Sequence, residues 1–232
     1  MHESKTKSKI LVVISGDHFI RNYLTTDALQ GLEQNFDCHF VANSETLNRV
    51  DLEKKATFRG YYTIDVKTKV IHQKIFDGLM YLYRKRSRSF RYRIKRQTPT
   101  LTLALNGTFR RFHLRLGKWI LITPLLLTFR AFLNIRFFSE WYLEWLKSRV
   151  HPNEKLKSFI CGDDYRLIIF PSSAYDVDGT DVAWVCEQED LPSLFLIDNW
   201  DNISSKSVFW KKPKYLAVWG AQSKEQAVAI QK

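Results

Sequence analysis

The sequence predicts an α/β protein built on a parallel sheet, and three observations carry this prediction. Residues 9–15, KILVVIS, form an unbroken apolar run rich in β-branched residues, which is typical of a strand buried on both faces. A stretch with apolar residues at helical spacing and a second apolar run follow, as in a strand–helix–strand unit. The same alternation returns after residue 165, beyond a long basic segment. With 232 residues and 45% hydrophobic content, the chain can bury one substantial core.

Up to residue 83 the pattern predicts three strands and two helices. The strands are expected at residues 9–15, 37–42 and 58–66. The helices are expected at residues 20–34 and 70–83, where apolar residues recur every three or four positions. The first unit is expected to cross over in the right-handed sense.

Beyond residue 83 the sequence predicts a long helix from about Pro124 to Lys147, which ends at His151-Pro152-Asn153. Strands follow at 165–170, 192–197 and 214–219. A helix is expected at 178–187, capped by Asp178 or Thr180, and another from Ser223, where Ser-x-x-Gln has the spacing of a capping box. The chain is therefore expected to form a single Rossmann-like domain over residues 1–232, with a basic, aromatic helical insertion at residues 70–150.

The net charge of +12 is concentrated in that insertion, because residues 78–139 hold 14 of the 36 Lys/Arg and none of the 24 Asp/Glu. Three interpretations stay open: an anionic membrane surface, nucleic acid bound through interleaved Arg and aromatic residues, or a solvated helical subdomain. The aromatic and aliphatic content favours the membrane surface over nucleic acid. About ten uninterrupted apolar residues are too few for a spanning helix. The residues expected to bind the membrane are Arg84, Lys85, Arg86, Arg91, Arg93, Trp119, Phe129 and Phe132.

Cysteine usage and the N-terminus favour a cytoplasmic protein. Cys38, Cys161 and Cys186 are odd in number and widely spaced, so we expect buried, reduced thiols rather than disulfides or a zinc site. The apolar run after the basic N-terminus is too short for a secretion signal. Together with the basic segment, this predicts a protein peripheral to the cytoplasmic face of a membrane.

Candidate chemistry begins with Asp17 and His18, directly after the first strand. A carboxylate or an imidazole there could act as general base toward a hydroxyl nucleophile. Alternatively, Asp17 caps the next helix and His18 packs or faces solvent. The pair Asp176 and Asp178 has the Asp-x-Asp spacing of some metal-dependent sugar transferases, yet helix capping explains it better, and no metal is expected.

A polar loop after the strand at 192–197 is the second candidate. It reads Asp-Asn-Trp-Asp-Asn, and the expected substrate-binding residues are Asn199, Trp200, Asp201, Asn202 and Lys206. A Trp at the strand end, among hydrogen-bonding side chains, suits either a stacking platform for a sugar ring or a packing anchor, and Asp and Asn also form loops for purely structural reasons. The Gly-rich nucleotide-binding, zinc-protease and serine-hydrolase motifs are missing from the sequence.

Both ends of the chain resemble GT-B-fold glycosyltransferases of surface polysaccharide and glycolipid biosynthesis. The resemblance covers residues 1–65 and 163–232 and is strongest in LFLIDNWDNISSKSVFWKKPKYLAVWGAQSKEQA. The matching positions of that stretch are Trp200, Asp201, Asn202, Lys206, Pro213, Val218, Trp219 and Gly220. The basic middle of the chain resembles such families only in its expected helical character.

The resemblance implies the acceptor-binding half of a glycosyltransferase, with the base in the loop after the first strand. A nucleotide-sugar is the implied co-substrate, without a cofactor, and a glycan or glycolipid is the implied acceptor. An inverting and a retaining outcome both stay open. The donor-binding domain is expected beyond Lys232 in a longer protein or in a partner chain; otherwise transfer activity has been lost. The alternative is a non-catalytic scaffold of the same fold that binds a membrane or a partner enzyme.

Overall fold

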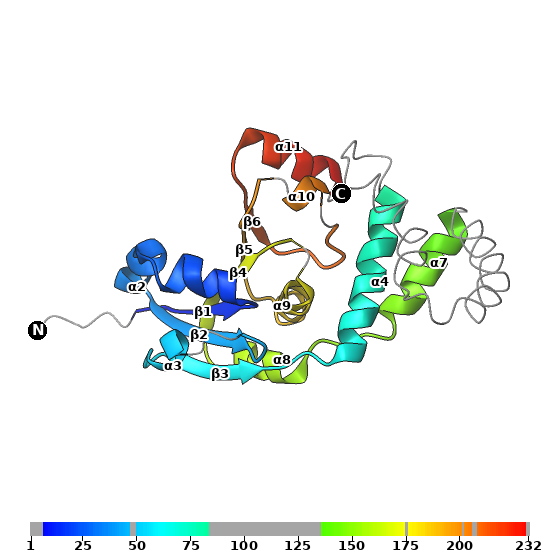
Figure 1. Cartoon of the computed structure of the whole chain (residues 1–232). Coiled ribbons are helices and arrows are strands. Elements are labelled where there is room, and N and C mark those ends of the chain that lie inside the picture. The colour runs from blue at the N-terminus through cyan, green and yellow to red at the C-terminus, as the bar shows by residue number, and fades with distance from the viewer. Residues whose placement is uncertain are drawn as a thin grey trace, which may run out of the picture.

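A computed structural model describes residues 7–46, 50–83, 136–174, 176–200, 202–205 and 208–230. Its centre is a six-stranded sheet in the order β3-β2-β1-β4-β5-β6 (Figure 1). All neighbouring strands pair in parallel. The strands are β1 Lys9–Ile14, β2 Asp37–Asn43, β3 Phe58–Tyr62, β4 Tyr165–Ser172, β5 Ser193–Ile197 and β6 Tyr215–Ala217. The predicted α/β class and parallel sheet are confirmed, and the strand order is Rossmann-like.

Helices cover both faces of this sheet (Figure 1). Between the first three strands lie α1 Asp17–Phe19, the π-helical η1 Ile20–Leu24, the 3-10 helix η2 Asp27–Leu29, α2 Gln30–Asn35 and α3 Val50–Glu53. The later helices are α4 Val66–Tyr83, α7 Arg136–Lys147, α8 Glu154–Cys161, α9 Val177–Gln188, α10 Asn202–Ser205 and α11 Ala221–Ile230.

The central strands are buried because each face has its own apolar layer. On β1, Leu11 and Val13 point into a core shared with α8 and α9. Ile10, Val12 and Ile14 point the other way, toward Phe19, Ile20 and the first helical segment. This burial on both faces explains the unbroken apolar run in the sequence.

The predicted helix over residues 20–34 is wrong as one continuous element. The chain forms η1, η2 and α2 in succession. The hydroxyl of Thr25 donates to the Arg21 carbonyl at 2.6 Å, and that of Thr26 donates to the Asn22 carbonyl at 2.7 Å. Such bonds from Thr to the preceding turn compete with regular helical pairing, and periodicity alone does not reveal them.

Other boundaries also differ from prediction, and capping side chains mark the starts of α4 and α8. Strand β3 ends at Tyr62, and α4 begins at Val66, where the Asp65 carboxylate accepts the Thr68 amide at 2.9 Å. Helix α8 was not predicted, although Asn153 caps it by accepting the Leu156 amide at 2.9 Å. The N-cap of α9 is Asp176 rather than Asp178 or Thr180. Helix α11 begins at Ala221, so the predicted capping box at Ser223 is wrong.

Two helices of the predicted insertion fall within the described residues, α4 and α7. They pack together through Ile75, Leu79, Leu143 and Leu146, in a small core apart from those of the sheet (Figure 1). Helix α7 matches the C-terminal half of the predicted 124–147 helix. The residues predicted to bind the membrane, Arg84, Lys85, Arg86, Arg91, Arg93, Trp119, Phe129 and Phe132, lie outside the described residues.

Two further sequence predictions concern membrane spans and cysteines. Among the described helices, none combines the length and the apolar composition that crossing a bilayer demands. All three cysteines are unpaired; Cys38 and Cys186 are buried, but Cys161 is exposed, so the expectation of burial is wrong for that residue.

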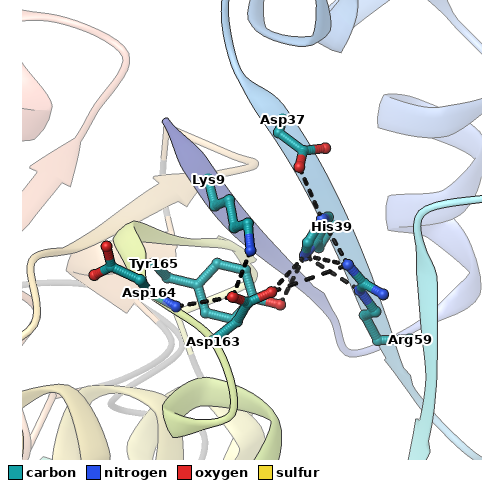
Figure 2. A network of polar contacts seen from close by, with 7 residues as sticks. All are labelled: Lys9, Asp37, His39, Arg59, Asp163, Asp164 and Tyr165. Carbon is teal, nitrogen blue, oxygen red and sulfur yellow. Dashed lines mark hydrogen bonds and ion pairs between the residues drawn. The ribbon is translucent and has the colours of Figure 1, made fainter. Parts of the chain in front are cut away.

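A polar network joins the amino ends of four strands (Figure 2). Its centre is His39 on β2, a side chain only 2% exposed, whose Nδ1 lies 2.9 Å from the Tyr165 hydroxyl of β4. The Asp37 carboxylate lies 3.2 Å from Nε2 of the same ring, and Arg59 of β3 lies 2.8 Å from it.

Asp163, just before β4, extends this network and accepts the Lys9 ammonium at 2.5 Å. The hydrogen bond from Lys9 lowers the pKa of the Asp163 carboxyl. Because these charges are part-exposed, solvent screening keeps each ion pair weak. The network fixes how β1 to β4 are aligned at the edge opposite their carboxyl ends.

Gly179 offers a test of the packing between α9 and the sheet. A Cβ at this position would lie 2.8 Å from Cε1 of Phe170 and 3.2 Å from Phe195. We expect Gly179→Ala to lower the free energy of unfolding by about 1–3 kcal/mol, because rigid rings must shift. Gly31→Ala is the matched control, since nothing lies within 4 Å of its Cβ position. Urea unfolding measures both, and equal stability of the two variants contradicts this account.

Candidate functional site

The candidate site lies at the carboxyl ends of β1, β4 and β5. Strand order reverses between β1 and β4, which pair directly, and ligands of open α/β sheets bind outside the carboxyl ends of the strands at such a point. The loop after β1 carries His18, the loop after β4 carries Ser173, and the loop after β5 carries Asp198. These three residues are distant in sequence and adjacent in space.

Three side chains form a continuous polar contact between the loops after β1, β4 and β5. Nε2 of His18 lies 3.2 Å from the Ser173 hydroxyl, and that hydroxyl lies 3.2 Å from Oδ2 of Asp198. Nε2 of His18 is also 3.8 Å from Oδ2 of Asp198. The His18 side chain is 43% exposed and that of Asp198 only 16%. The Ser173 hydroxyl thus connects the part-exposed imidazole of His18 to the mostly buried carboxylate of Asp198.

Asn202 supports Asp198 from behind. Its Nδ2 donates to Oδ1 of Asp198, and the Asn202 side chain is fully buried at the start of α10. The carboxylate of Asp198 therefore accepts two hydrogen bonds, one from Asn202 and one from Ser173. Each oxygen has its own partner, so the carboxylate is fixed in orientation.

The turn after β4 holds Ser173 in place. The Ser173 amide donates to Oδ2 of Asp176 at 2.6 Å, and the Ala174 amide donates to the Ser172 hydroxyl at 2.9 Å. Ala174 itself has φ 65°, a left-handed conformation that costs a non-glycine residue about 1 kcal/mol or more. Burial is the main cause that raises the pKa of Asp176 to about 7.

Two exposed tryptophans, Trp200 and Trp219, belong to the loops that follow β5 and β6. Trp200 is 58% exposed, and its carbonyl accepts the Ser223 hydroxyl at 3.3 Å. Trp219, after β6, is 68% exposed, although its Nε1 donates to the Ile197 carbonyl at 2.8 Å. That bond anchors the Trp219 indole next to Asp198 while most of the ring remains open to a ligand.

Buried acids lie behind the site. Asp178 accepts the Tyr62 hydroxyl at 2.6 Å and the Asn43 amide at 2.9 Å, which joins α9 to the ends of β2 and β3. Burial, the largest cause, raises the pKa of Asp178. These bonds hold the first turn of α9 against the sheet.

Asp181 and His72 form a second buried contact, between α9 and α4. Both side chains are fully buried, with His72 Nε2 3.9 Å from Oδ1 of Asp181. Burial raises the pKa of Asp181 to about 8 and lowers that of His72 to about 4. Around neutral pH both groups therefore favour their uncharged forms.

Of the predicted site residues, His18 and Asn202 belong to this cluster. Asp17 begins α1 beside His18 and is half-buried. Asn199 and Trp200 lie exposed on the loop after β5, while Asp201 and Lys206 lie outside the described residues. Within the described ranges, no three His, Cys, Asp or Glu side chains are grouped so that they could hold a metal ion.

Sequence reasoning did not assign Ser173, Asp198 or Trp219 to the site. Asp198 opens the polar loop that was singled out, but no pattern linked it to His18. Ser173 follows a buried strand, and the position after a parallel strand is the signal that could have identified it. The pairing of β1 with β4, which joins these loops, is a property of the fold.

Comparisons with protein-family models, with curated proteins and with solved structures found no match to this chain. The functional assignment therefore depends on the site itself and on the motifs in the sequence.

Asp181 gives this region a predicted pH dependence. The folded protein retains the Asp181 proton up to about pH 8, whereas the unfolded chain releases it near the ordinary value of 3.8. Between these values the folded state binds more protons, so its stability falls as pH rises. Between about pH 5 and pH 8, we expect the free energy of unfolding of Asp181→Asn to fall by about 1–3 kcal/mol less than that of wild type.

Urea unfolding across this range measures the effect. Asp27→Asn, at an exposed position, is the control and should follow the wild-type curve. Parallel curves for wild type and Asp181→Asn contradict the assignment. His72 acts in the opposite direction, since its lowered pKa reduces stability as pH falls below 6.5 toward about 4.

Proposed function

We propose that this chain is the acceptor-binding part of a glycosyltransferase, with His18 as the general base. The observation that carries the proposal is the accessible imidazole of His18, held by Ser173 and Asp198 at the point where strand order reverses. Ligands of open α/β sheets bind at this place. The resemblance of both chain ends to GT-B glycosyltransferases supplies the substrate class.

In the proposed reaction, His18 takes the proton of an acceptor hydroxyl as its oxygen bonds to the anomeric carbon of the donor sugar. The bond between that carbon and the diphosphate oxygen breaks, and the nucleoside diphosphate leaves with the electron pair. Positioned proton transfer of this kind contributes about 10²–10⁴-fold to the rate. The Asp198 carboxylate, 3.8 Å from Nε2, offsets the positive charge that His18 gains.

The surroundings of His18 suit a hydroxyl-rich acceptor. The exposed rings of Trp200 and Trp219 offer apolar faces to a sugar ring, and Asn199 adds an exposed amide. The donor nucleotide-sugar is proposed to bind a second domain, which a longer protein or a partner chain supplies.

A membrane location is also proposed, because a lipid-linked acceptor requires access to a bilayer. On α7, Phe137, Trp141 and Trp145 are spaced four residues apart and are 69%, 61% and 42% exposed. They form one stripe, while Leu143 and Leu146 of the same helix pack on α4. Aromatic side chains in this arrangement suit a membrane interface, and the basic segment leading into α7 suits anionic lipid headgroups.

The base assignment predicts that His18→Ala lowers transfer by about 10²–10⁴-fold, since the acceptor proton has no positioned recipient. The measurement is transfer of labelled sugar from a panel of nucleotide-sugars to a lipid extract, with the donor-binding domain present. His151→Ala, at an exposed site after α7, is the matched control. If His18→Ala retains full activity while Asp17→Asn loses it, the base is Asp17.

The membrane assignment predicts that replacing Phe137, Trp141 and Trp145 together by Ser weakens binding to phosphatidylcholine vesicles containing phosphatidylglycerol. We expect a loss on the order of tenfold or more, from the apolar area no longer buried in lipid. Tyr215→Ser with Val228→Ser, two exposed apolar residues elsewhere, is the control.

Vesicle flotation at matched salt measures this binding. Equal flotation of wild type and the α7 variant contradicts a role of Phe137, Trp141 and Trp145 in vesicle binding. The non-catalytic scaffold remains the second proposal, and it gains support if vesicle binding is lost with the α7 stripe while no nucleotide-sugar is consumed.

A further inference from the structure

We propose that Ser173 and Asp198 are positioning residues that keep the proton of the neutral His18 ring on Nε2. Nδ1 is then the nitrogen that takes the acceptor proton. The base role of His18 rests on the proposed function, whereas the position of the ring proton follows from the hydrogen bonds alone.

The inference comes from counting hydrogens along the contact. A serine hydroxyl has one hydrogen to donate, and an ionised carboxylate only accepts. Ser173 lies 3.2 Å from Asp198 Oδ2 and 3.2 Å from His18 Nε2, so it has two close neighbours for one hydrogen. If Ser173 donates to His18, its oxygen faces the carboxylate with no proton between them. Both contacts are hydrogen bonds only when Ser173 donates to Asp198 and accepts from Nε2–H of His18.

Asn202 fixes the donor-to-acceptor direction of the series of hydrogen bonds that runs from His18 through Ser173 to Asp198. Its amide group donates to Oδ1 of Asp198, so that oxygen must be an acceptor as well. Each carboxylate oxygen of Asp198 thus accepts a hydrogen bond, Oδ1 from Asn202 and Oδ2 from Ser173. The series runs from His18 through Ser173 to Asp198, and the only ring nitrogen of His18 left with a lone pair is Nδ1.

Gly16 leaves space beside that nitrogen. A Cβ at residue 16 would lie 3.4 Å from Nδ1 and 3.5 Å from Cε1 of His18. The backbone of Gly16 is extended, with φ −171° and ψ 166°, a conformation that any residue adopts. A methyl group at this position therefore fits without backbone strain and covers the side of the ring from which an acceptor hydroxyl reaches Nδ1.

In the proposed step, the acceptor hydroxyl hydrogen-bonds to Nδ1, and its proton moves there as the new C–O bond forms. The proton on Nε2 stays in place, as does the hydrogen that Ser173 shares with Asp198. The ring becomes an imidazolium with both nitrogens as donors, and Nε2–H continues to bond to Ser173. No proton has to travel along the series.

The test is nitrogen-15 NMR of the neutral His18 ring, with His18→Gln used to assign the signals. We expect Nε2 to show the shift of a protonated nitrogen, and Nδ1 that of a nitrogen with a lone pair. We also expect an Nε2–H proton signal that persists against exchange with water. A neutral wild-type ring protonated on Nδ1 overturns the proposal.

Asp198→Asn provides the discriminating variant. While Asn202 keeps its Nδ2 directed at position 198, the introduced amide presents its oxygen to Asn202 and its NH₂ faces Ser173. Ser173 then accepts from that NH₂ and donates to Nε2 of His18. We expect the two ring nitrogens to exchange roles, with the proton on Nδ1.

Combining Asp198→Asn with Asn202→Asp swaps the amide and the carboxylate. The amide at position 198 can now donate to position 202 and turn its oxygen to Ser173, so the wild-type tautomer is expected to return. An unchanged tautomer in Asp198→Asn refutes the positioning role when backbone amide spectra show an intact fold and side-chain amide signals show that Asn202 still donates its NH₂ to position 198. Loss of the persistent Nε2–H signal in Ser173→Ala is expected, and its survival counts against Ser173 as the link.

Gly16→Ala separates this proposal from the proposed function. We expect its tautomer to match wild type, while sugar transfer falls on the order of tenfold or more because the acceptor is displaced from Nδ1. Transfer equal to wild type argues against approach at Nδ1. If no transfer is found for any variant but the tautomers behave as expected, the glycosyltransferase assignment fails and the positioning by Ser173 and Asp198 stands.

Discussion

The pairing of β1 with β4 is the constraint on which the rest of the structure depends. Lys9 and Tyr165 face each other in this pairing, although more than half of the chain lies between them. Because the two strands are parallel, their carboxyl ends emerge at the same edge of the sheet, which brings His18 to Ser173. The same alignment brings His39 to Tyr165 at the opposite edge. The β1–β4 pair thus connects the two halves of both polar clusters, whose other members come from β2, β3 and the loop after β5.

The two edges use charge differently. At the amino edge, Lys9 and Arg59 are part-exposed and form ion pairs with Asp163, while Asp37 contacts His39. At the carboxyl edge the acids behind the candidate site are buried, and burial shifts the pKa of Asp176 and Asp181 toward neutrality. Ionised pairs at one edge maintain alignment, while protonatable carboxyls at the other allow α9 to pack tightly behind the site.

The fold could be predicted from the sequence further than the site could. Strands buried on both faces produce unbroken apolar runs, so the parallel sheet was predictable from β1, β2 and β4. Helix limits depended on single side chains such as Thr25, Asp65 and Asn153, whose bonds leave no periodic trace. His18 was identifiable by its place after β1. Its partners Ser173 and Asp198 were not, because their proximity arises from strand order, which local sequence patterns do not specify.

The α4–α7 pair has a consequence for how this protein can change over evolution. These helices share a core of their own, separate from the two layers on the sheet, and they bracket residues 84–135. Substitutions in the small core between α4 and α7 can therefore accumulate without altering the two sheet layers that position His18. The two helices can change together while the sheet beneath the candidate site stays constant.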